Sequence, residues 1–416
     1  MSVRSEQAES RTAKSHIYQA LNEGCIRLLC LQPGLLSSPL RAYLQTVSLQ
    51  NVPSWRLHHD RWRYELDCVL ASIPKNTELP ELESSRLSAD VYIAISYVWG
   101  APLFTHELRI EDDCVLMITE SLHSALQNFR SEDKVTRFWA DAVCIDRAND
   151  VEKAVQVAMM AQIYRQAYGV MVWLGPAEAG DALAFATISF YPHRPTMIGT
   201  EAHNWLSDDA LTSMLHTLGT HLTKSSQCPC CRCSFACDPD RVSAASSGLL
   251  AMGHLLARSW FTRLWVVQEV LGEDSSSRPG VKLCCGNHSA PFDEFSQFVT
   301  LELLYLLHDA FRKSDTIGAC VRECLDGLRN DPRARTIMNN IDNLLSPNVF
   351  ITTNYKQSHL KFWTAFSSLS YRACRDPRDR IFAVRHLLGL EHFSALMPDY
   401  TVTATHLFRK FPCTMI

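Results

Sequence analysis

The sequence lacks several features that would assign it to a common class of protein. Residues 1–16 are polar and hold no apolar stretch of the kind found in secretory signals, and no later apolar run reaches the ~18 residues of a membrane span. Only 16 of the 416 residues are glycine, and neither a phosphate-binding loop nor a dinucleotide-binding fingerprint is present. We therefore expect a cytoplasmic protein with no membrane span, outside the common nucleotide-binding folds.

An excess of one charge is also lacking. The chain has 40 Lys and Arg against 44 Asp and Glu, a formal net charge of -4, and 47% hydrophobic residues. This composition is typical of a folded protein that buries a core, and it argues against a nucleic-acid partner. A chain of 416 residues corresponds to about two or three domains, or to one domain with large insertions.

The order of predicted elements indicates an α/β fold. Apolar runs rich in β-branched and aromatic residues predict strands at residues 25–31, 91–99, 137–145, 170–174 and 281–285, with a weaker element at 40–49. A helix between the third and fourth of these strands predicts a βαβ unit with parallel strands. We expect a capping box of Asn149 and Glu152 at its start, a buried stripe of Val155, Met159 and Ile163, and a second stripe of Met160, Tyr164 and Ala167 beside the first.

Three regions follow from this pattern. Residues 1–90 are predicted to be a lead-in packed on the core, residues 91–290 an α/β domain with an insertion at about 177–257, and residues 291–416 a helical C-terminal region. The abrupt end of the sequence leaves a truncated gene model open as an alternative. Within the α/β domain, residues 259–271 are predicted to form one helix capped by Ser259. Near the end, Asp376 and Pro377 are typical of a helix start, which we favour over a polar contact surface.

Clustered cysteines suggest a metal site inside the insertion. Overlapping CxxC steps at residues 228–237 bring together Cys228, Cys230, Cys231, Cys233 and Cys237. We name Cys228, Cys231, Cys233 and Cys237 as candidate ligands of a structural zinc ion, with Cys284, Cys285, His216 or His221 as further ligands. The second, distant CxxC pair of a zinc ribbon is absent from the sequence, so an oxidisable loop remains the alternative.

Three blocks of sequence resemble the heterokaryon-incompatibility (HET) domain of filamentous fungi. They are Tyr-Ile-Ala-Ile-Ser-Tyr-Val-Trp-Gly at 92–100, Phe-Trp-Ala-Asp-Ala-Val-Cys-Ile-Asp at 138–146 with its helix and following strand, and Trp-Phe-Thr-Arg-Leu-Trp-Val-Val-Gln-Glu at 260–269. Residues 375–380, 388–390 and 398–400 resemble the segment that often follows this domain. The resemblance implies an intracellular effector of non-self recognition that triggers programmed cell death. At one position the chain departs from the family, since Arg147 stands where Gln is common.

The HET domain is more remotely similar to the TIR fold, a parallel sheet flanked by helices. Residues 95–97 resemble the first TIR box, and Ser259 and Trp260 followed by Glu269 resemble the TIR helix that carries a catalytic glutamate. By this resemblance Glu269 is the candidate catalytic residue, with NAD as the substrate. The alternative is that Glu269 is structural, solvated or paired with Arg263 or Arg258, and that the chain signals only through self-association or a protein partner.

Polar and aromatic residues at predicted strand ends supply candidate substrate contacts. Ligands bind at the carboxyl ends of parallel strands, where we place Ser96, Tyr97, Trp99, Asp141 and Asp146, with Trp265 beside Glu269. Trp99 or Trp265 could stack on a base or nicotinamide ring. The competing interpretation makes the tryptophans core residues and Asp146 a loop residue. Asp141, a charge in an apolar strand, needs a partner, for which we name Arg137 or Arg263.

Overall fold

The computed structural model describes residues 18–52, 91–111, 114–189, 239–270, 280–299, 330, 332–333, 335–337, 369, 372–383, 385 and 397–414. The chain divides into two compact units. The first is made of Met1–Gly175, Arg263–Lys282 and Phe350–Ile416, and the second of Pro176–Thr262 and Leu283–Val349.

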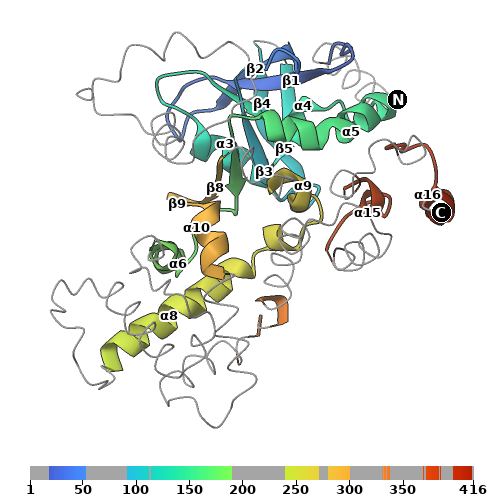
Figure 1. Ribbon diagram of the computed structural model, residues 1–416. Coiled ribbons are helices and arrows are strands. Elements are labelled where there is room, and N and C mark those ends of the chain that lie inside the picture. The colour runs from blue at the N-terminus through green and yellow to red at the C-terminus, as the bar shows by residue number, and fades with distance from the viewer. Residues whose placement is uncertain are drawn as a thin grey trace, which may run out of the picture. The chain divides into compact units, whose positions relative to one another are not determined.

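A mixed β-sheet forms the centre of the first unit (Figure 1). Its strands are β1 (Cys25–Leu31), β2 (Leu40–Ser48), β3 (Ile93–Tyr97), β4 (Phe104–Ile110), β5 (Cys114–Thr119), β6 (Thr136–Trp139) and β7 (Gly169–Trp173). They are ordered β5-β4-β2-β1-β6-β3-β7, and the order continues through β8 (Gly280–Cys285) to β9 (His288–Pro291). The α/β class and the strands expected at 25–31, 40–49, 91–99, 170–174 and 281–285 are confirmed.

The sheet is parallel only in part. β3 pairs in parallel with β6 and with β7, whereas β1 is antiparallel to both β2 and β6, and β4 is antiparallel to β5. β6 and β7 run in the same direction, as expected for a βαβ unit, but β3 lies between them. β2 and β4 also pair in parallel. The expectation of a parallel sheet therefore holds for β6-β3-β7 and for β2-β4, and is wrong for the sheet as a whole.

The strand predicted at 137–145 is wrong in its second half. β6 ends at Trp139, and the chain turns into the short helix α4 (Asp141–Cys144). The backbone N–H of Cys144 donates to the Ala140 carbonyl at 2.8 Å, a helical hydrogen bond. Val143, Cys144 and Ile145 are all buried in this turn. A short apolar run is buried equally well by a strand or by a helical turn, so its pattern does not separate the two.

Helix α5 (Asp150–Gln166) begins where the sequence predicts. The Asn149 side chain accepts hydrogen bonds from the backbone N–H groups of Val151 and Glu152, at 3.1 and 3.2 Å, which confirms its capping role. The reciprocal half of the expected capping box is not formed, because the Glu152 carboxylate accepts from the Asp146 N–H and pairs with the buried Arg27.

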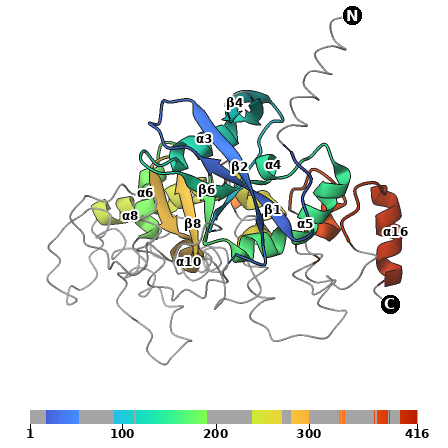
Figure 2. The same cartoon turned by 90° about the horizontal axis from the view of Figure 1, so that it is seen from above.

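The buried face of α5 differs from the expected one. It consists of Gln156, Val157, Met160, Ile163 and Tyr164. Of the stripe predicted through Val155, Met159 and Ile163, only Ile163 is buried, since Val155 is 47% exposed and Met159 is half-buried, whereas the neighbouring stripe is buried throughout. Figure 2 shows α5 alongside β1, where Gln156 donates a hydrogen bond to the Cys25 carbonyl at 2.9 Å.

The single helix predicted at 259–271 is also interrupted. The 3-10 helix η3 (Ser259–Thr262) and the short helix α9 (Val266–Val270) replace it. Between them, Arg263 forms a parallel β-bridge with Ala373, and the Leu264 N–H donates to the Ala373 carbonyl at 2.9 Å. A backbone engaged in this bridge cannot also keep helical hydrogen bonds, which is why the helical periodicity of the sequence is not realised there.

The second unit holds helices α6 (Asp181–Ile188), α8 (Pro239–Leu256) and α10 (Phe292–Gln297). Toward the C-terminus, the first unit contains α15 (Asp379–Phe382) and α16 (Ala404–Thr414). α15 starts slightly after the expected position, and the Asp376 carboxylate accepts from the Arg378 N–H at 3.0 Å. Within the described part of the chain, no helix combines the length and the apolarity needed to cross a membrane.

Candidate functional site

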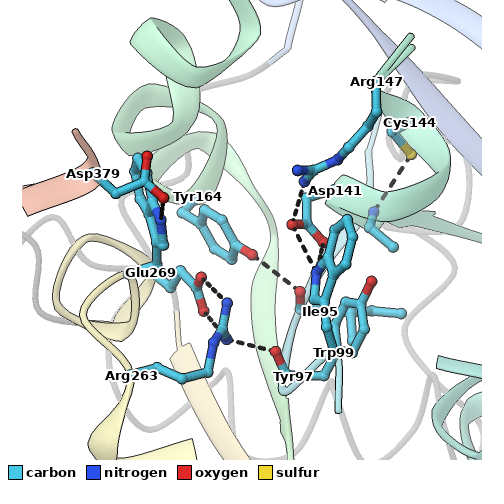
Figure 3. Close-up of polar contacts among 12 residues, drawn as sticks. Ile95, Tyr97, Trp99, Asp141, Cys144, Arg147, Tyr164, Arg263, Glu269 and Asp379 are labelled. Carbon is cyan, nitrogen blue, oxygen red and sulfur yellow. Dashed lines mark hydrogen bonds and ion pairs between the residues drawn. The ribbon is translucent and has the colours of Figure 1, made fainter. Parts of the chain in front are cut away.

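Glu269 is a buried carboxylate that pairs with Arg263, which in turn contacts the end of the central strand β3 (Figure 3). It lies on α9, and its side chain is only 2% exposed. Ser96 on β3 donates a hydrogen bond to Oε2 of Glu269. The guanidinium of Arg263 spans the carboxylate, with Nη1 and Nη2 each 3.4 Å from one oxygen. Both carboxylate oxygens therefore have partners, and Arg263 rather than Arg258 is the paired arginine.

The environment of Glu269 acts on its protonation. Burial raises the pKa of Glu269 above its ordinary value, the Arg263 guanidinium and the Ser96 hydroxyl oppose this rise, and the Asp141 carboxylate adds to it. Burial by itself would lower the pKa of Arg263, but Glu269 and Asp141 outweigh it, so the pKa of Arg263 is raised. Arg263 thus stays charged, and the carboxyl beside it holds its proton more readily than an exposed glutamate.

Arg263 also joins this pair to the backbone of β3. Its Nη1 donates to the Tyr97 carbonyl at the end of the strand. Two residues earlier in β3, the Ile95 carbonyl accepts a hydrogen bond from the Tyr164 hydroxyl on α5, at 3.0 Å. Burial, with Asp141 nearby, raises the pKa of the Tyr97 hydroxyl well above its ordinary value. Hydrogen bonds from α5 and from the segment preceding α9 thus hold the last residues of β3.

A second polar group lies at the same end of the parallel strands. The indole Nε1 of Trp99 donates to both oxygens of Asp141, at 3.1 and 3.2 Å, and Arg147 pairs with Asp141 at 2.7 Å. Asp141 stands on α4 and not in a strand, and these two residues, rather than Arg137 or Arg263, are its hydrogen-bonded partners. Trp99 and Asp141 are thus brought together as expected from their places after β3 and β6.

Arg147, the position that departs from the family pattern, completes this group. Its guanidinium lies 4.2 Å from the centroid of the Trp99 ring while it pairs with Asp141. The sequence marked Arg147 as unusual but gave no sign of these partners, because they come from two other elements. A planar cation stacked on an indole and paired with a carboxylate is a stable arrangement for an arginine.

The remaining candidate contacts lie differently. The Asp146 side chain accepts from the Ala148 N–H at 3.1 Å, the geometry of a loop residue, and no described contact joins it to Glu269. Trp265 is half-buried and donates from Nε1 to Asp379 at 3.0 Å. Of the tryptophans expected in the core, Trp139, Trp173 and Trp260 are buried, whereas Trp99 and Trp265 are partly exposed.

Asp379 is a buried acid that the sequence predicted only as part of a helix start. It is 9% exposed and accepts hydrogen bonds from Trp265 and from the Tyr400 hydroxyl, the latter at 2.8 Å. Burial raises the pKa of Asp379, and these two hydrogen bonds oppose the rise. Lys153 lies 3.6 Å over the Tyr400 ring, which ties α5 to the same group.

The predicted zinc ligands at 228–237 lie outside the described residues, so the zinc site stays a prediction. Cys284 and Cys285, named as further ligands, are both buried. Cys285 contacts Asp181 at 3.1 Å, and burial followed by this hydrogen bond raises its thiol pKa to about 12. The described residues contain no group of three or more His, Cys, Asp or Glu side chains placed to hold a metal ion.

Comparison with known proteins supports the resemblance to the HET domain. Residues 92–269 match the protein-family model described as "Heterokaryon incompatibility protein (HET)". Over 342 residues the chain is 25% identical to "Heterokaryon incompatibility protein 6, OR allele" of Neurospora crassa, a stretch covering 76% of this chain and 45% of that protein. The chain therefore spans less than half the length of this relative. No solved structure matches the chain.

Proposed function

We propose that this chain is an effector of heterokaryon incompatibility that triggers cell death by hydrolysing NAD, with Glu269 as the catalytic residue. The observation that carries the proposal is the burial of the Glu269 carboxylate at the carboxyl end of the central parallel strand, beside Ser96. Ligands of open α/β sheets bind at this end. Burial of a carboxylate is unfavourable, so a carboxylate is rarely buried at such a position unless it has a function.

The reaction assigned to this site is hydrolysis of the bond between nicotinamide and ribose. The bond from C1′ of the ribose to the ring nitrogen breaks, its electron pair leaves with nicotinamide, and positive charge develops on the ribose. Water then adds its oxygen to C1′ and releases a proton, which gives ADP-ribose, nicotinamide and H⁺. A carboxylate beside C1′ stabilises the oxocarbenium-like transition state, as in glycosidases. The 3.4 Å contacts with Arg263 are the ones that a bound ribose would replace.

The test is NAD turnover by the purified full chain at high concentration, where self-association is favoured. Glu269→Gln keeps the shape of the side chain and removes its charge, and Glu269→Ala removes both. Glu107→Gln is the matched control, since the Glu107 side chain is 60% exposed on β4. We expect turnover by the wild type and Glu107→Gln, and a loss of about 100-fold or more in both Glu269 variants. Intact NAD with folded wild-type protein, or equal turnover by Glu269→Ala, would refute the proposal.

A second candidate function is signalling by protein contact alone. The observation that favours it is that Ser96 and Arg263 already occupy both oxygens of Glu269, as expected of a structural ion pair. Expression of the same three variants in a fungal host separates the two functions. Persistent killing by Glu269→Gln, with NAD levels unchanged, would favour contact signalling, whereas loss of killing together with loss of NAD consumption favours the enzyme.

A further inference from the structure

We infer that Asp379 is a positioning residue for the Glu269 site and that residues 372–382 form a clamp, which holds residues 263–269 against the end of β3. The clamp lies outside the stretch 92–269 that matches the HET family model. The inference rests on the proposed function only where catalysis is the readout, since the clamp itself is measurable without any substrate.

The first half of the clamp acts on the backbone around Arg263. The parallel bridge between Arg263 and Ala373 includes the hydrogen bond from the Leu264 N–H to the Ala373 carbonyl, at 2.9 Å. The buried Arg372 donates from Nη1 to the carbonyl of Arg263 at 3.1 Å. These contacts fix the backbone of the residue whose guanidinium spans Glu269.

The second half acts on α9 and the turn before it through two side chains that precede Glu269 in sequence. Trp265, four residues before Glu269, donates to Oδ2 of Asp379 at 3.0 Å. Gln268, next to Glu269, donates from Nε2 to the Phe382 carbonyl at 3.2 Å. The residues directly before Glu269 are therefore held by two hydrogen bonds to the same clamp.

Asp379 is itself held in one orientation. Its Oδ1 accepts from the Tyr400 hydroxyl at 2.8 Å, while its Oδ2 receives the Trp265 indole. Arg378 secures Tyr400 in turn by donating to the Tyr400 carbonyl at 2.6 Å and to the Val402 carbonyl at 2.8 Å. Since both carboxylate oxygens are used, Asp379 can neither rotate nor shift without breaking a hydrogen bond.

The short length of α9 makes such a clamp necessary. α9 has five residues, fewer than two helical turns, and a helix of this length has no stability of its own in water. The place of Glu269 must therefore be fixed by tertiary contacts. Ser96 and Arg263 contact the carboxylate directly, whereas the clamp holds the residues that precede it, through Trp265 and Gln268.

Hydrogen exchange of the full-length protein tests the clamp directly. Within α9 and the turn before it, the N–H groups of Val267, Gln268 and Glu269 donate to the carbonyls of Leu264 and Trp265. In Asp379→Ala we expect their exchange to quicken by about tenfold or more, with β1 and β2 unchanged. Asp379→Asn keeps one acceptor for Trp265 and one donor for Tyr400, so most of the protection should return. Asp399→Ala is the matched control, because the Asp399 carboxylate accepts from Thr401 and has no described hydrogen bond to residues 263–269.

Unchanged exchange of these amides in Asp379→Ala would overturn the inference. If this variant unfolds throughout, with β1 and β2 exchanging as well, Trp265→Phe decides, because it removes the indole donor and keeps an aromatic ring. Faster exchange confined to residues 263–270 in that variant supports the clamp, and unchanged exchange overturns it. In NAD turnover, a positioning role predicts a lower kcat with little change in KM for Asp379→Ala, restored in Asp379→Asn. If the wild type turns over no NAD, the proposed function fails while hydrogen exchange still decides the clamp.

Discussion

Ser96 donates a hydrogen bond to Glu269, a residue 173 positions later in the chain. Ser96 is completely buried near the end of β3, so its hydroxyl is a polar group in an otherwise apolar strand, and the Glu269 carboxylate is its acceptor. Arg263 supplies the opposite charge from the other side, at 3.4 Å. A buried acid, its counter-ion and a strand-end hydroxyl form one unit, in which each member is needed to satisfy the others.

Removal of Arg263 should expose the energetic dependence of Glu269 on its partner. Arg263→Met removes the guanidinium that pairs with Glu269. The carboxylate then remains buried with Ser96 as its hydrogen-bond donor and without its counter-ion. Breaking a buried ion pair from one side lowers the free energy of unfolding by about 3–5 kcal/mol. Urea denaturation at neutral pH measures the change.

The double variant Arg263→Met with Glu269→Gln is the control for this prediction. A neutral amide no longer requires a counter-ion, so the double variant should recover part of the stability lost in Arg263→Met. If the losses in the two single variants simply add, the two side chains are not energetically coupled, and the ion pair is not what stabilises the site.

The pH dependence of stability should reveal the buried Asp379. Burial raises its pKa above 3.8, with Asp376 adding to the rise, whereas Trp265, Tyr400 and Lys153 oppose it. The folded state therefore binds this proton more tightly than the unfolded state. The resulting stability is fully present below the unfolded pKa and is lost as the pH rises through the folded one.

Asp379→Asn isolates that contribution, because the amide does not titrate. As the pH rises from about 3.8 to the raised pKa, the wild type should lose stability relative to this variant, by at most about 1.4 kcal/mol per pH unit. Urea denaturation of both proteins across this interval measures the difference. Parallel curves, or a wild type that gains relative stability, would show that the pKa of Asp379 is not raised.

Among the strands that the sequence predicted, β3 and β7 have the clearest signal, because each is a continuous and buried apolar run. β3 and β7 are buried along their whole length, and their sequences, Ile-Ala-Ile-Ser-Tyr and Gly-Val-Met-Val-Trp, are almost wholly apolar. β4 was not predicted, because it exposes alternate residues and reads Phe-Thr-His-Glu-Leu-Arg-Ile. The order of strands, with β3 between β6 and β7, depends on long-range pairing that no local pattern encodes.

The site was predictable to a similar degree. Resemblance to a family pointed to Glu269 and Ser96, and the strand-end rule placed Trp99 near Asp141. Arg147 and Asp379 were missed as site residues, since the tryptophans that they contact, Trp99 and Trp265, are distant in sequence, and a charged residue near a helix start is equally well explained as a cap. Which of two explanations applies becomes clear only when the side chain is seen to point inward, as that of Asp379 does.

Loss of the cap of α5 should have a modest, local effect. Asn149→Ala removes the acceptor of two backbone N–H groups, those of Val151 and Glu152, and should lower the free energy of unfolding by about 1 kcal/mol. Asn128→Ala is the control, since Asn128 is exposed within α3 (Glu120–Phe129) and its change should stay within about 0.5 kcal/mol. Equal losses in the two variants, measured by urea denaturation, would contradict a capping role.

Alanine substitutions at two glycines with positive φ should distinguish the energetic cost of backbone strain from that of steric overlap. Gly24 has φ of +71° with open space where a Cβ would stand, whereas Gly286 has φ of +53° and its Cβ would lie 2.6 Å from the Cβ and 2.8 Å from the N of Ala177. In Gly24→Ala the free energy of unfolding should therefore fall only by the strain of an alanine in the left-handed conformation, about 1 kcal/mol. In Gly286→Ala it should fall by about 1–3 kcal/mol more, because the backbone of Ala177 must move.

Thermal denaturation compares the stability of the two variants. Adding Ala177→Gly to Gly286→Ala should restore part of the extra loss by removing one of the overlapping atoms. A loss in Gly286→Ala no larger than that in Gly24→Ala would mean that the chain around Ala177 yields freely and that its close approach to Gly286 does not stabilise the second unit.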